Sequence, residues 1–294
     1  MIQPVFRFAP SPNGRLHLGH AYSALLNAEM AARSRGRFLL RIEDIDRARC
    51  KSEYERAIVA DLAWLGLTFR ETPRRQSEHS GDYASALDRL TGRGLVYPCF
   101  CTRGEIARAA GPAHDPDGAP LYPGTCRAMT PAERAALFSS GRGAGLRLDM
   151  ARALAEAPGD LHWREYGEGA VETIVRADPS AWGDFLLKRK GMPASYHLAV
   201  VVDDALQGVS DVVRGRDLFA ATSAHRLLQR LLEIAPPRYR HHRLVRDFAG
   251  AKISKSAAST PLEELRRNGV SAQGIRAALG FGAAAPHGLK ATIN

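Results

Sequence analysis

The hydrophobic pattern of the N-terminal part alternates between short apolar runs and apolar positions at helical spacing. Residues 5–9, VFRFA, form an apolar run that predicts a short buried strand. Residues 18–35 repeat their apolar positions with a helical period and end at Gly36, which predicts a helix. A second strand is predicted over 37–46 (RFLLRIEDID) and a second helix over 52–66. Strands and helices that alternate in this way predict an α/β protein built on a parallel sheet.

The pattern breaks after the sequence LVYPCFC. Residues 110–126 are rich in Pro and Gly, and their apolar positions follow neither the period of a helix nor that of a strand. We therefore interpret 91–169 as a module inserted between two halves of a catalytic domain, 1–90 and 170–240. The remaining residues, 241–294, are expected to form a basic loop and a short helical tail.

Strand-like and helical patterns resume after the insertion. Strands are predicted at AVETIVRA (170–177), DFLLKR (184–189) and HLAVVVDD (197–204). The segment DLFAATSAHRLLQRLLEI (217–234) predicts a strongly amphipathic helix, and TPLEELRRNG (260–269) predicts a capped helix.

Composition narrows the class of protein. With 294 residues and 45% hydrophobic residues, the chain can form one large domain with an insertion or two modest domains. It lacks both an apolar stretch of about 18 residues, as a membrane span needs, and the pattern of a signal peptide. We expect a cytoplasmic protein whose four cysteines stay reduced. The net charge of +10 is typical of a protein with a polyanionic partner, although an arginine-rich composition that serves solubility is the alternative.

The N-terminal stretch FAPSPNGRLHLGH joins the first predicted strand to the first predicted helix. A helix N-terminus after a strand and a tight turn binds anions through backbone N–H groups and the helix dipole. His17 and His20 could add donors to a triphosphate, and Gly19 would allow a close approach to the backbone. The alternative is that both histidines are solvated or cap the helix. The sequence has no P-loop pattern.

The basic loop AKISKS, residues 251–256, places Lys252 and Lys255 between small residues. Such a loop can close on a pyrophosphate as negative charge develops in the transition state. A solvated turn is the alternative for the loop taken alone, but the His-x-Gly-His motif upstream favours a role in catalysis.

These motifs resemble the HIGH and KMSKS elements of class I aminoacyl-tRNA synthetases. The blocks RFAPSPNGRLHLGH, LLRIEDIDRAR and VVVDDALQGVSDVVRGRDL resemble the glutamyl branch of that class. The resemblance implies a Rossmann-type domain that activates an amino acid with ATP and Mg²⁺, giving an aminoacyl-adenylate and pyrophosphate. It implies catalytic roles for His17, His20, Lys252 and Lys255, and ATP contacts from His17, Gly19, His20 and Lys255.

A glutamate pocket needs cations for two carboxylates and an anion for one ammonium group. Arg7 and Arg214 can each hold a carboxylate bidentately, and Glu43 suits the ammonium group. Ser11 and Tyr196 can add neutral hydrogen bonds. The family resemblance assigns these five residues, together with Phe8, Ala9 and Pro10, to glutamate. Taken singly, each charged residue could instead form a surface ion pair, and which arginine takes the side-chain carboxylate stays open.

Two acidic residues, Asp203 and Asp204, follow the strand predicted over 197–204. They could contact the ribose or a bound Mg²⁺.

Three cysteines in the inserted module suggest a structural zinc site. Cys99, Cys101 and Cys126 flank the Pro/Gly-rich segment, and a closed zinc site needs four ligands. Chemistry alone favours His114 as the fourth ligand. The family resemblance implies Tyr122, because glutamyl-type enzymes carry a Cys-x-Cys…Tyr-x-x-x-Cys site. Cys50 has no partner nearby in the sequence and is expected to be a bystander.

The chain ends shortly after the KISKS loop, so we expect no anticodon-binding domain. This organisation resembles a family of truncated paralogues, the glutamyl-queuosine tRNA(Asp) synthetases. The resemblance implies that glutamate is esterified onto the queuosine base in the anticodon loop of tRNA(Asp), by an enzyme expected to be a monomer. The alternatives are a catalytic fragment of an orthodox glutamyl-tRNA synthetase and an idle paralogue that only binds RNA or another partner. A plain nucleotidyltransferase is less favoured because it would lack the glutamate pocket and the zinc insertion.

Overall fold

The computed structural model describes residues 3–167, 171–246, 260–282 and 292–293. The N-terminal elements follow the predicted alternation and lie in the order β1 (Val5–Phe8), α1 (Leu18–Arg33), β2 (Arg37–Ile42), α2 (Ser52–Trp64), β3 (Arg74–Arg75) and α3 (Ser80–Gly92). The inserted segment contains β4 (Val96–Cys99), α4 (Arg103–Ala109), α5 (Pro131–Ser139), β5 (Gly145–Leu148), α6 (Met150–Glu156) and β6 (His162–Tyr166). There follow β7 (Glu172–Arg176), β8 (Leu186–Lys188), α7 (Tyr196–Leu206), β9 (Asp211–Gly215), α8 (Ala221–Leu231), β10 (Arg238–His242), β11 (Val245–Arg246), α9 (Leu262–Arg267), α10 (Ala272–Ala278) and β12 (Thr292–Ile293).

A seven-stranded sheet in the order β3-β2-β1-β9-β10-β6-β7 forms the centre of the molecule. Every neighbouring pair is parallel except β6 and β7, which form an antiparallel edge. The direction of strand addition changes at β1, since β2 lies on one side of it and β9 on the other. The predicted α/β class with a mostly parallel sheet is therefore confirmed.

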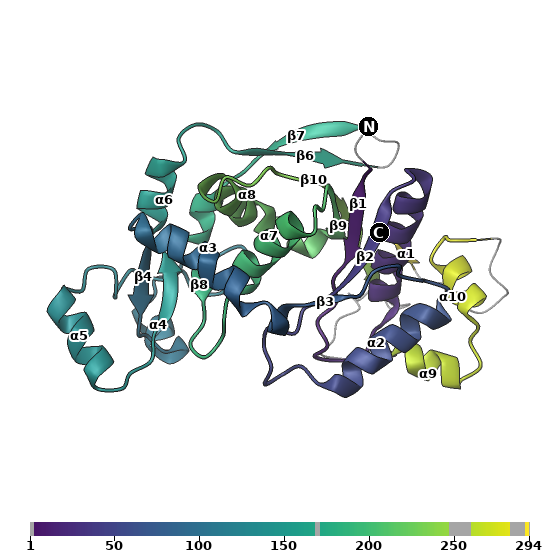
Figure 1. The fold of residues 1–294 in the computed structure, drawn as a ribbon, viewed down its shortest axis with the longest axis horizontal. Coiled ribbons are helices and arrows are strands. Elements are labelled where there is room, and N and C mark those ends of the chain that lie inside the picture. The colour runs from purple at the N-terminus through teal and green to yellow at the C-terminus, as the bar shows by residue number, and fades with distance from the viewer. Residues whose placement is uncertain (1–2, 168–170, 247–259, 283–291, 294) are drawn as a thin grey trace.

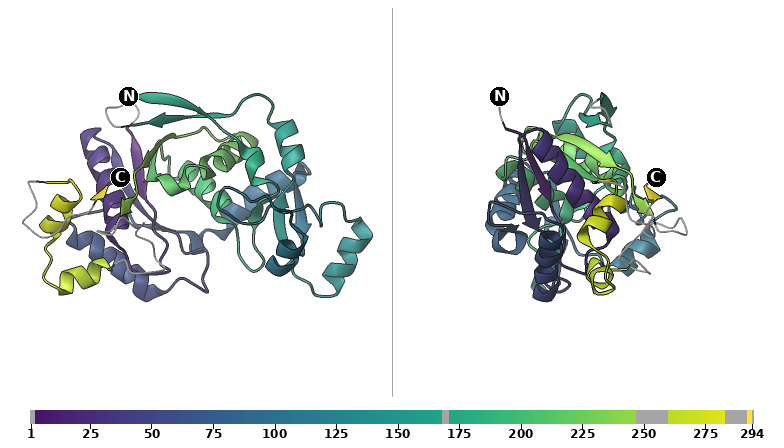
Figure 2. Two further views of the ribbon diagram at one scale, coloured as in Figure 1. Left: turned by 180° about the vertical axis from the view of Figure 1, so that it is seen from behind. Right: turned by 90° about the vertical axis from the view of Figure 1, so that its right-hand side faces the viewer.

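The central strands of this sheet, β1, β2 and β9, are largely buried on both faces, whereas the edge strand β7 is mostly exposed. Val5 and Leu39 pack in one hydrophobic cluster with side chains of α3, α7 and α8. Phe6 and Leu40, the next residues along the same strands, pack in a second cluster with α1 and α2. Adjacent residues of a strand point to opposite faces, so one sheet serves two cores. The molecule is elongated, with α9 and α10 at one end and α4 and α5 at the other (Figures 1 and 2).

The strand predicted over residues 197–204 is wrong, because this segment lies within helix α7. The Ser195 side chain caps the helix by accepting a hydrogen bond from the Leu198 backbone N–H, and every residue from Leu198 to Asp204 is buried. A segment buried on all sides has no polar face and hence no helical period. Its three consecutive valines then favour a strand by composition alone.

Helix α8 confirms the helix predicted over 217–234, but its polar side is not exposed. Ten of its eleven residues are buried, including Thr222, His225 and Gln229, and Arg230 is the exception. A polar helix face inside a protein needs hydrogen-bonding partners there. Thr222 and His225 of this face hydrogen-bond Arg214, a residue of the candidate site described below.

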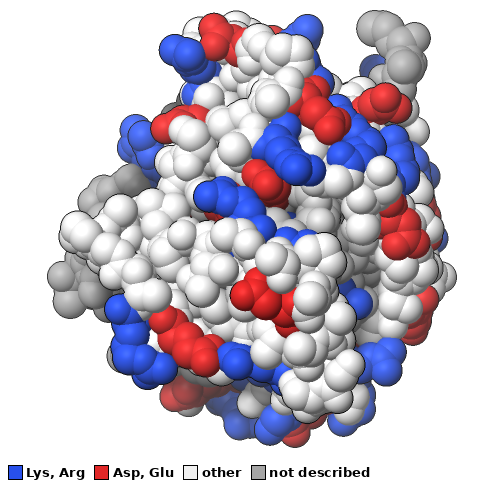
Figure 3. Space-filling view, turned by 90° about the vertical axis from the view of Figure 1, so that its left-hand side faces the viewer, with Lys and Arg blue, Asp and Glu red and all other residues white. Residues whose placement is uncertain are grey.

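The inserted segment forms a three-stranded antiparallel sheet in the order β4-β5-β8. Strand β8 belongs to the expected second half of the catalytic domain, while β6, from the expected insertion, pairs in the large sheet. Each of the two sheets therefore contains strands from both sides of the boundary that was expected between residues 169 and 170. At this end of the molecule, Lys and Arg are interspersed with Asp and Glu around uncharged surface (Figure 3).

The C-terminal segment packs against the first half of the sheet. Helix α9 confirms the predicted helix, although its N-cap residue, Pro261, offers no side-chain hydrogen bond. The Leu262 N–H donates to the Leu16 carbonyl, which joins α9 to the turn before α1.

Lys252 and Lys255 lie outside the described residues. Within the part of the chain that is described, no helix is long and apolar enough to cross a membrane.

Candidate active site

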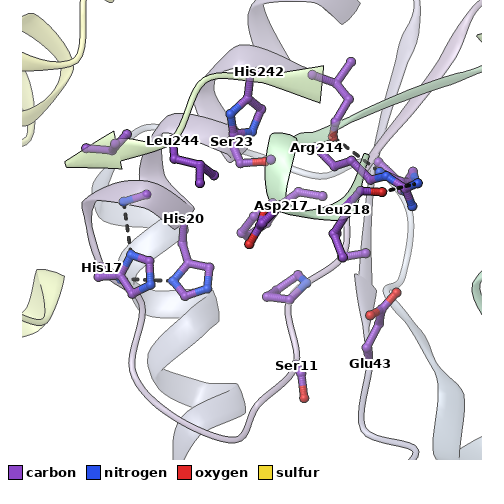
Figure 4. A pocket seen from close by; sticks show the side chains of 18 of the residues that line it. Ser11, His17, His20, Ser23, Glu43, Arg214, Asp217, Leu218, His242 and Leu244 are labelled. Atoms are coloured by element: carbon purple, nitrogen blue, oxygen red, sulfur yellow. Dashed lines mark hydrogen bonds between the residues drawn. The ribbon is translucent and has the colours of Figure 1, made fainter. Parts of the chain in front are cut away.

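A cavity of about 500 Å³ opens at the carboxyl ends of β1 and β9, where the direction of strand addition changes. Open parallel sheets form their ligand crevices at such switch points. The cavity brings together every predicted glutamate and nucleotide residue within the described part of the chain: Arg7, Phe8, Ala9, Pro10, Ser11, His17, Gly19, His20, Glu43, Tyr196 and Arg214. His17 and His20 lie on one side of it, while Glu43 and Arg214 lie on the other (Figure 4).

The two histidines cap helix α1. The Gly19 N–H donates to His17 Nδ1 at 3.1 Å, and the His17 N–H donates to His20 Nδ1 at 3.2 Å. A Cβ at position 19 would lie only 3.0 Å from His17 Cε1, so a glycine leaves room for this imidazole. The capping alternative is therefore confirmed, and it fixes both rings at the helix N-terminus that faces the cavity.

Buried ion pairs hold Arg7 and Glu43 in place. The Asp204 Oδ1 accepts a hydrogen bond from Arg7 Nε at 3.0 Å and one from Arg41 Nη1 at 2.7 Å. Arg41, which is fully buried, also donates from Nη2 to Glu43 Oε1 at 3.3 Å. Burial raises the pKa of Glu43, while the positive charges of Arg41 and Arg7 act in the opposite direction. The network therefore joins one cation and one anion of the predicted glutamate pocket through Arg41.

The suggested contact of Asp203 and Asp204 with ribose or Mg²⁺ does not fit this arrangement. Asp203 is fully buried and accepts hydrogen bonds from Arg74 Nε, Gln76 Nε2 and the Tyr83 hydroxyl. Asp204 faces the two guanidinium groups of Arg7 and Arg41. Both carboxylates balance buried arginines, as buried charges require.

Arg214 is held more tightly than its predicted role implies. Its Nε donates to His241 Nε2 at 3.1 Å, and its Nη1 donates to His225 Nδ1 at 3.2 Å. Its Nη2 donates to the Leu218 carbonyl at 3.1 Å and to Thr222 Oγ1 at 2.8 Å. A guanidinium has five N–H bonds, so four are used and one remains on Nη1. A bidentate grip on a carboxylate therefore does not fit Arg214 in this structure. Arg7, in contrast, donates two hydrogen bonds to protein groups, from Nε to Asp204 and from Nη1 to the Val213 carbonyl at 3.5 Å.

The histidines around Arg214 are neutral. Burial is the main cause that lowers the pKa of His197 and of His241 to about 4 and the pKa of His225 well below its usual range. The positive charge of Arg214 adds to this effect at all three. Arg214 is thus the cation of this cluster, and the imidazoles act as neutral hydrogen-bonding groups.

Ser11 and Tyr196 line the cavity as predicted, and Cys50 lies close to one of them. The Cys50 Sγ is 3.7 Å from Ser11 Oγ and 3.9 Å from the Glu43 carbonyl. Cys50 lies outside the group formed by the other three cysteines, as expected of a bystander, and the loop after β2 brings it beside Ser11, which lines the cavity.

The predicted zinc ligands form a compact group in the inserted segment. The Sγ atoms of Cys99, Cys101 and Cys126 lie within 4.8 Å of one another, and the Cys101–Cys126 separation is 3.5 Å. The Tyr122 hydroxyl is 3.7 Å from Cys101 Sγ and accepts a hydrogen bond from the Cys126 N–H at 2.8 Å. His114 is exposed and contacts the Pro112 carbonyl instead. The three thiols are of the ligand type that zinc prefers and lie close enough together to share one ion.

Several residues of the site were not found by sequence reasoning. Arg41 lies two positions before Glu43 in the block LLRIEDIDRAR. A charged residue inside an apolar predicted strand was the signal that could have identified it. Thr222 and His225 lie on the polar side of α8. No sequence pattern pointed to Glu165, because this residue of β6 is linked to the site through His241 on β10.

Comparison with known proteins identifies the family. The model of the family described as tRNA synthetases class I (E and Q), catalytic domain, matches residues 4–293. A glutamyl-Q tRNA(Asp) synthetase from Rhodobacter capsulatus is 46% identical over 286 residues, which cover 94% of this chain and 100% of that protein. The glutamate–tRNA ligase 2 of Nitrosococcus oceani is 38% identical and covers 90% of this chain, which spans 56% of that ligase.

A solved structure shares the fold. The glutamate-tRNA synthetase of Elizabethkingia anophelis has a TM-score of 0.75 and 22% identity, over 95% of this chain and 61% of that one. The sequence resemblance drawn from the three motif blocks is thus confirmed, and the chain belongs to the class I tRNA synthetases of the glutamate and glutamine (E and Q) group.

Proposed function

We propose that this protein activates L-glutamate with ATP and transfers it to the queuosine base in the anticodon of tRNA(Asp). The observation that carries the proposal is the similarity, over nearly the whole chain, to relatives named glutamyl-Q tRNA(Asp) synthetase. In the first step a glutamate carboxylate attacks the α-phosphorus of ATP, and pyrophosphate leaves. In the second step a hydroxyl of the queuosine ring attacks the carbonyl of the adenylate, and AMP leaves.

The charges around the cavity support glutamate as the amino acid. Arg7 and Arg214 offer one cation for each carboxylate, and Glu43 offers an anion for the ammonium group. Arg7 and Arg214 are buried, so each would be left partly unpaired by a ligand that lacks a carboxylate. Ser11 and Tyr196 complete the proposed polar contacts, and Phe8, Ala9 and Pro10 line the cavity beside them.

The nucleotide is proposed to lie over the N-terminus of α1. His17, Gly19 and His20 face the cavity there, and the helix dipole favours the phosphates. Mg²⁺ would enter with ATP as part of the substrate. Lys252 and Lys255 are proposed to stabilise the charge on the leaving pyrophosphate, and they lie outside the described residues.

A structural Zn²⁺ is proposed for the inserted segment, held by Cys99, Cys101, Tyr122 and Cys126. The compact thiol group and the position of the Tyr122 hydroxyl support this choice over His114. A closed four-ligand site gives the metal a structural role, because no position is left for a substrate.

The anticodon loop is the proposed acceptor, and the enzyme is proposed to act as a monomer. Sequence-specific proteins usually read the bases of RNA in single-stranded loops, which suits a modified anticodon base. The net charge of +10 supports a sequence-independent attraction to the tRNA backbone.

The test is transfer of labelled glutamate to tRNA(Asp) with and without queuosine. Pyrophosphate exchange with glutamate is expected without any tRNA, and transfer is expected only to the queuosine-containing tRNA. Transfer should persist after the 3′ adenosine has been removed. Loss of transfer on this truncation, or charging of tRNA(Glu), would instead assign the protein to the orthodox glutamyl-tRNA synthetases.

A further inference from the structure

Arg214 lies between two imidazoles that come from different elements. His241 is on β10 and accepts from Arg214 Nε, while His225 is on α8 and accepts from Arg214 Nη1. Arg214 itself is at the end of β9 and is buried. An arginine can only donate hydrogen bonds, so each imidazole must present an unprotonated nitrogen to it.

Each imidazole is backed by a second group that fixes its tautomer. The His241 Nδ1–H donates to Glu165 Oε2 at 2.9 Å, which leaves Nε2 as the acceptor that Arg214 needs. The His225 Nε2 lies 3.2 Å from His197 Nδ1, so a proton on His225 Nε2 leaves its Nδ1 as the acceptor. Both chains of hydrogen bonds therefore begin at the guanidinium, which donates to each imidazole, and end on Glu165 and on His197.

Glu165 is itself fixed by neighbouring groups. It accepts from the His241 backbone N–H at 2.7 Å and from Trp163 Nε1 at 3.0 Å, in addition to the imidazole. The carboxylate therefore has one orientation, and it polarises the imidazole toward Arg214. It also places a compensating negative charge behind Arg214, without contacting the guanidinium and without reaching the cavity.

We propose that Arg214 is the cation for the side-chain carboxylate of glutamate, and that His241, oriented by Glu165, is a positioning residue that fixes Arg214 and thereby sets the preference for glutamate over uncharged amino acids. This inference rests on the proposed function of the cavity. Four of the five Arg214 N–H bonds are used by the protein, so the guanidinium presents its charge and one Nη1–H to the ligand in one orientation. Without His241, the guanidinium gains rotational freedom and one of its buried N–H groups loses its partner.

The primary variant is His241→Phe, which keeps an aromatic ring but removes both ring nitrogens. We expect the glutamate KM in pyrophosphate exchange to rise roughly 10- to 100-fold, the range that a lost hydrogen bond to a charged group gives. The ATP KM should change by less than about twofold, and the preference for glutamate over glutamine should fall, because glutamine depends less on the charge of Arg214. His241→Gln, whose side-chain oxygen can still accept from Arg214, should restore part of both losses.

Tyr239→Phe is the matched control. Tyr239 is buried on the same strand, and its hydroxyl accepts from Gln229 Nε2 at 2.9 Å. The Arg214 guanidinium lies 5.5 Å from the centre of the Tyr239 ring, which phenylalanine keeps. The control should lose stability and keep the wild-type KM for glutamate. An unchanged glutamate KM in His241→Phe, or an equal rise in Tyr239→Phe, would overturn the proposal.

A second measurement keeps the inference separate from the proposed function. The ¹⁵N–¹H signal of Arg214 Nε, assigned by its loss in Arg214→Lys, should be protected from solvent exchange in the wild type. It should become exchangeable in His241→Phe and be protected again in His241→Gln. Protection that survives in His241→Phe refutes the positioning role even if the wild type activates glutamate. Absence of glutamate-dependent exchange in the wild type, with the NMR pattern as expected, refutes the proposed function alone.

Discussion

Replacement of Arg41 by methionine removes the cation that joins Asp204 to Glu43. Arg41 is fully buried and lies 2.7 Å from Asp204, 3.3 Å from Glu43 and 3.8 Å from Asp203. Loss of one member of a buried ion network typically costs about 3–5 kcal/mol, because the remaining charges stay buried without compensation. Against a usual total of about 5–15 kcal/mol, the variant should fold but be much less stable.

The same substitution should weaken glutamate binding through Glu43. Burial raises the pKa of this carboxyl, and Arg41 is the largest influence that lowers it. Without Arg41 the pKa rises further, so more Glu43 is protonated and its proposed attraction for the substrate ammonium group is lost. We expect the glutamate KM to increase at least about tenfold, equivalent to 1.4 kcal/mol, and to recover partly as the pH is raised.

Urea denaturation and pyrophosphate exchange across pH measure the two effects. Arg41→Lys is the control, because it keeps the charge but cannot contact all three carboxylates at once. It should lose less stability than Arg41→Met, and its glutamate KM should depend less on pH. The reasoning fails if Arg41→Met unfolds at the wild-type urea concentration, or if its glutamate KM is raised equally at every pH.

Three further predictions concern other parts of the molecule. Tyr122→Phe should lower the zinc content measured by elemental analysis after dialysis against a chelator, whereas His114→Ala should not; the reverse result would identify His114 as the ligand. Burial raises the pKa of Asp61 to about 6, and in the described structure neither of its oxygens has a hydrogen-bond partner. Asp61→Asn should therefore raise the free energy of unfolding by up to about 3 kcal/mol above pH 6, and the gain should shrink toward pH 4; no gain in urea denaturation at pH 7.5 would contradict this. Because His197 and His241 have pKa values lowered to about 4 by burial, only the unfolded chain binds their protons between pH 6.5 and 4, so stability is full above this window and falls as the pH decreases through it. His197→Phe should flatten that decline in urea denaturation followed at several pH values, and an equally steep decline would show that other groups cause it.

The local sequence was sufficient to predict much of the first half of the fold. The apolar run at β1 and the helical period of α1 have clear boundaries, because a turn precedes the helix and Gly36 follows it. The cavity residues on the segment from Arg7 to His20 were also predictable, since a strand, a turn and a helix start are contiguous in the chain. Glu43 and Arg214 were added from the charges that a glutamate pocket needs and from the family resemblance, and the structure places both at the carboxyl ends of parallel strands.

The sequence could not show the type of α7. Its central residues are buried on every side, so the polar face that would reveal a helical period is missing. The error then placed Asp203 and Asp204 at a strand end near the substrate, whereas the helix directs them at buried arginines. A wrong element type thus produced a wrong functional assignment.

The amino-acid sequence by itself determined which side chains are candidates for the chemistry and which short segments present them, because those properties depend on neighbours in the chain. Only the tertiary structure decided how the charges are paired. Arg7 and Asp204 are 197 residues apart, and Glu165 and His241 are 76 apart, yet each pair is in direct contact. Such pairs form where strands and helices of different segments pack together in a buried interior, where an unpaired charge is too costly to persist, and local sequence patterns contain no information about that partner.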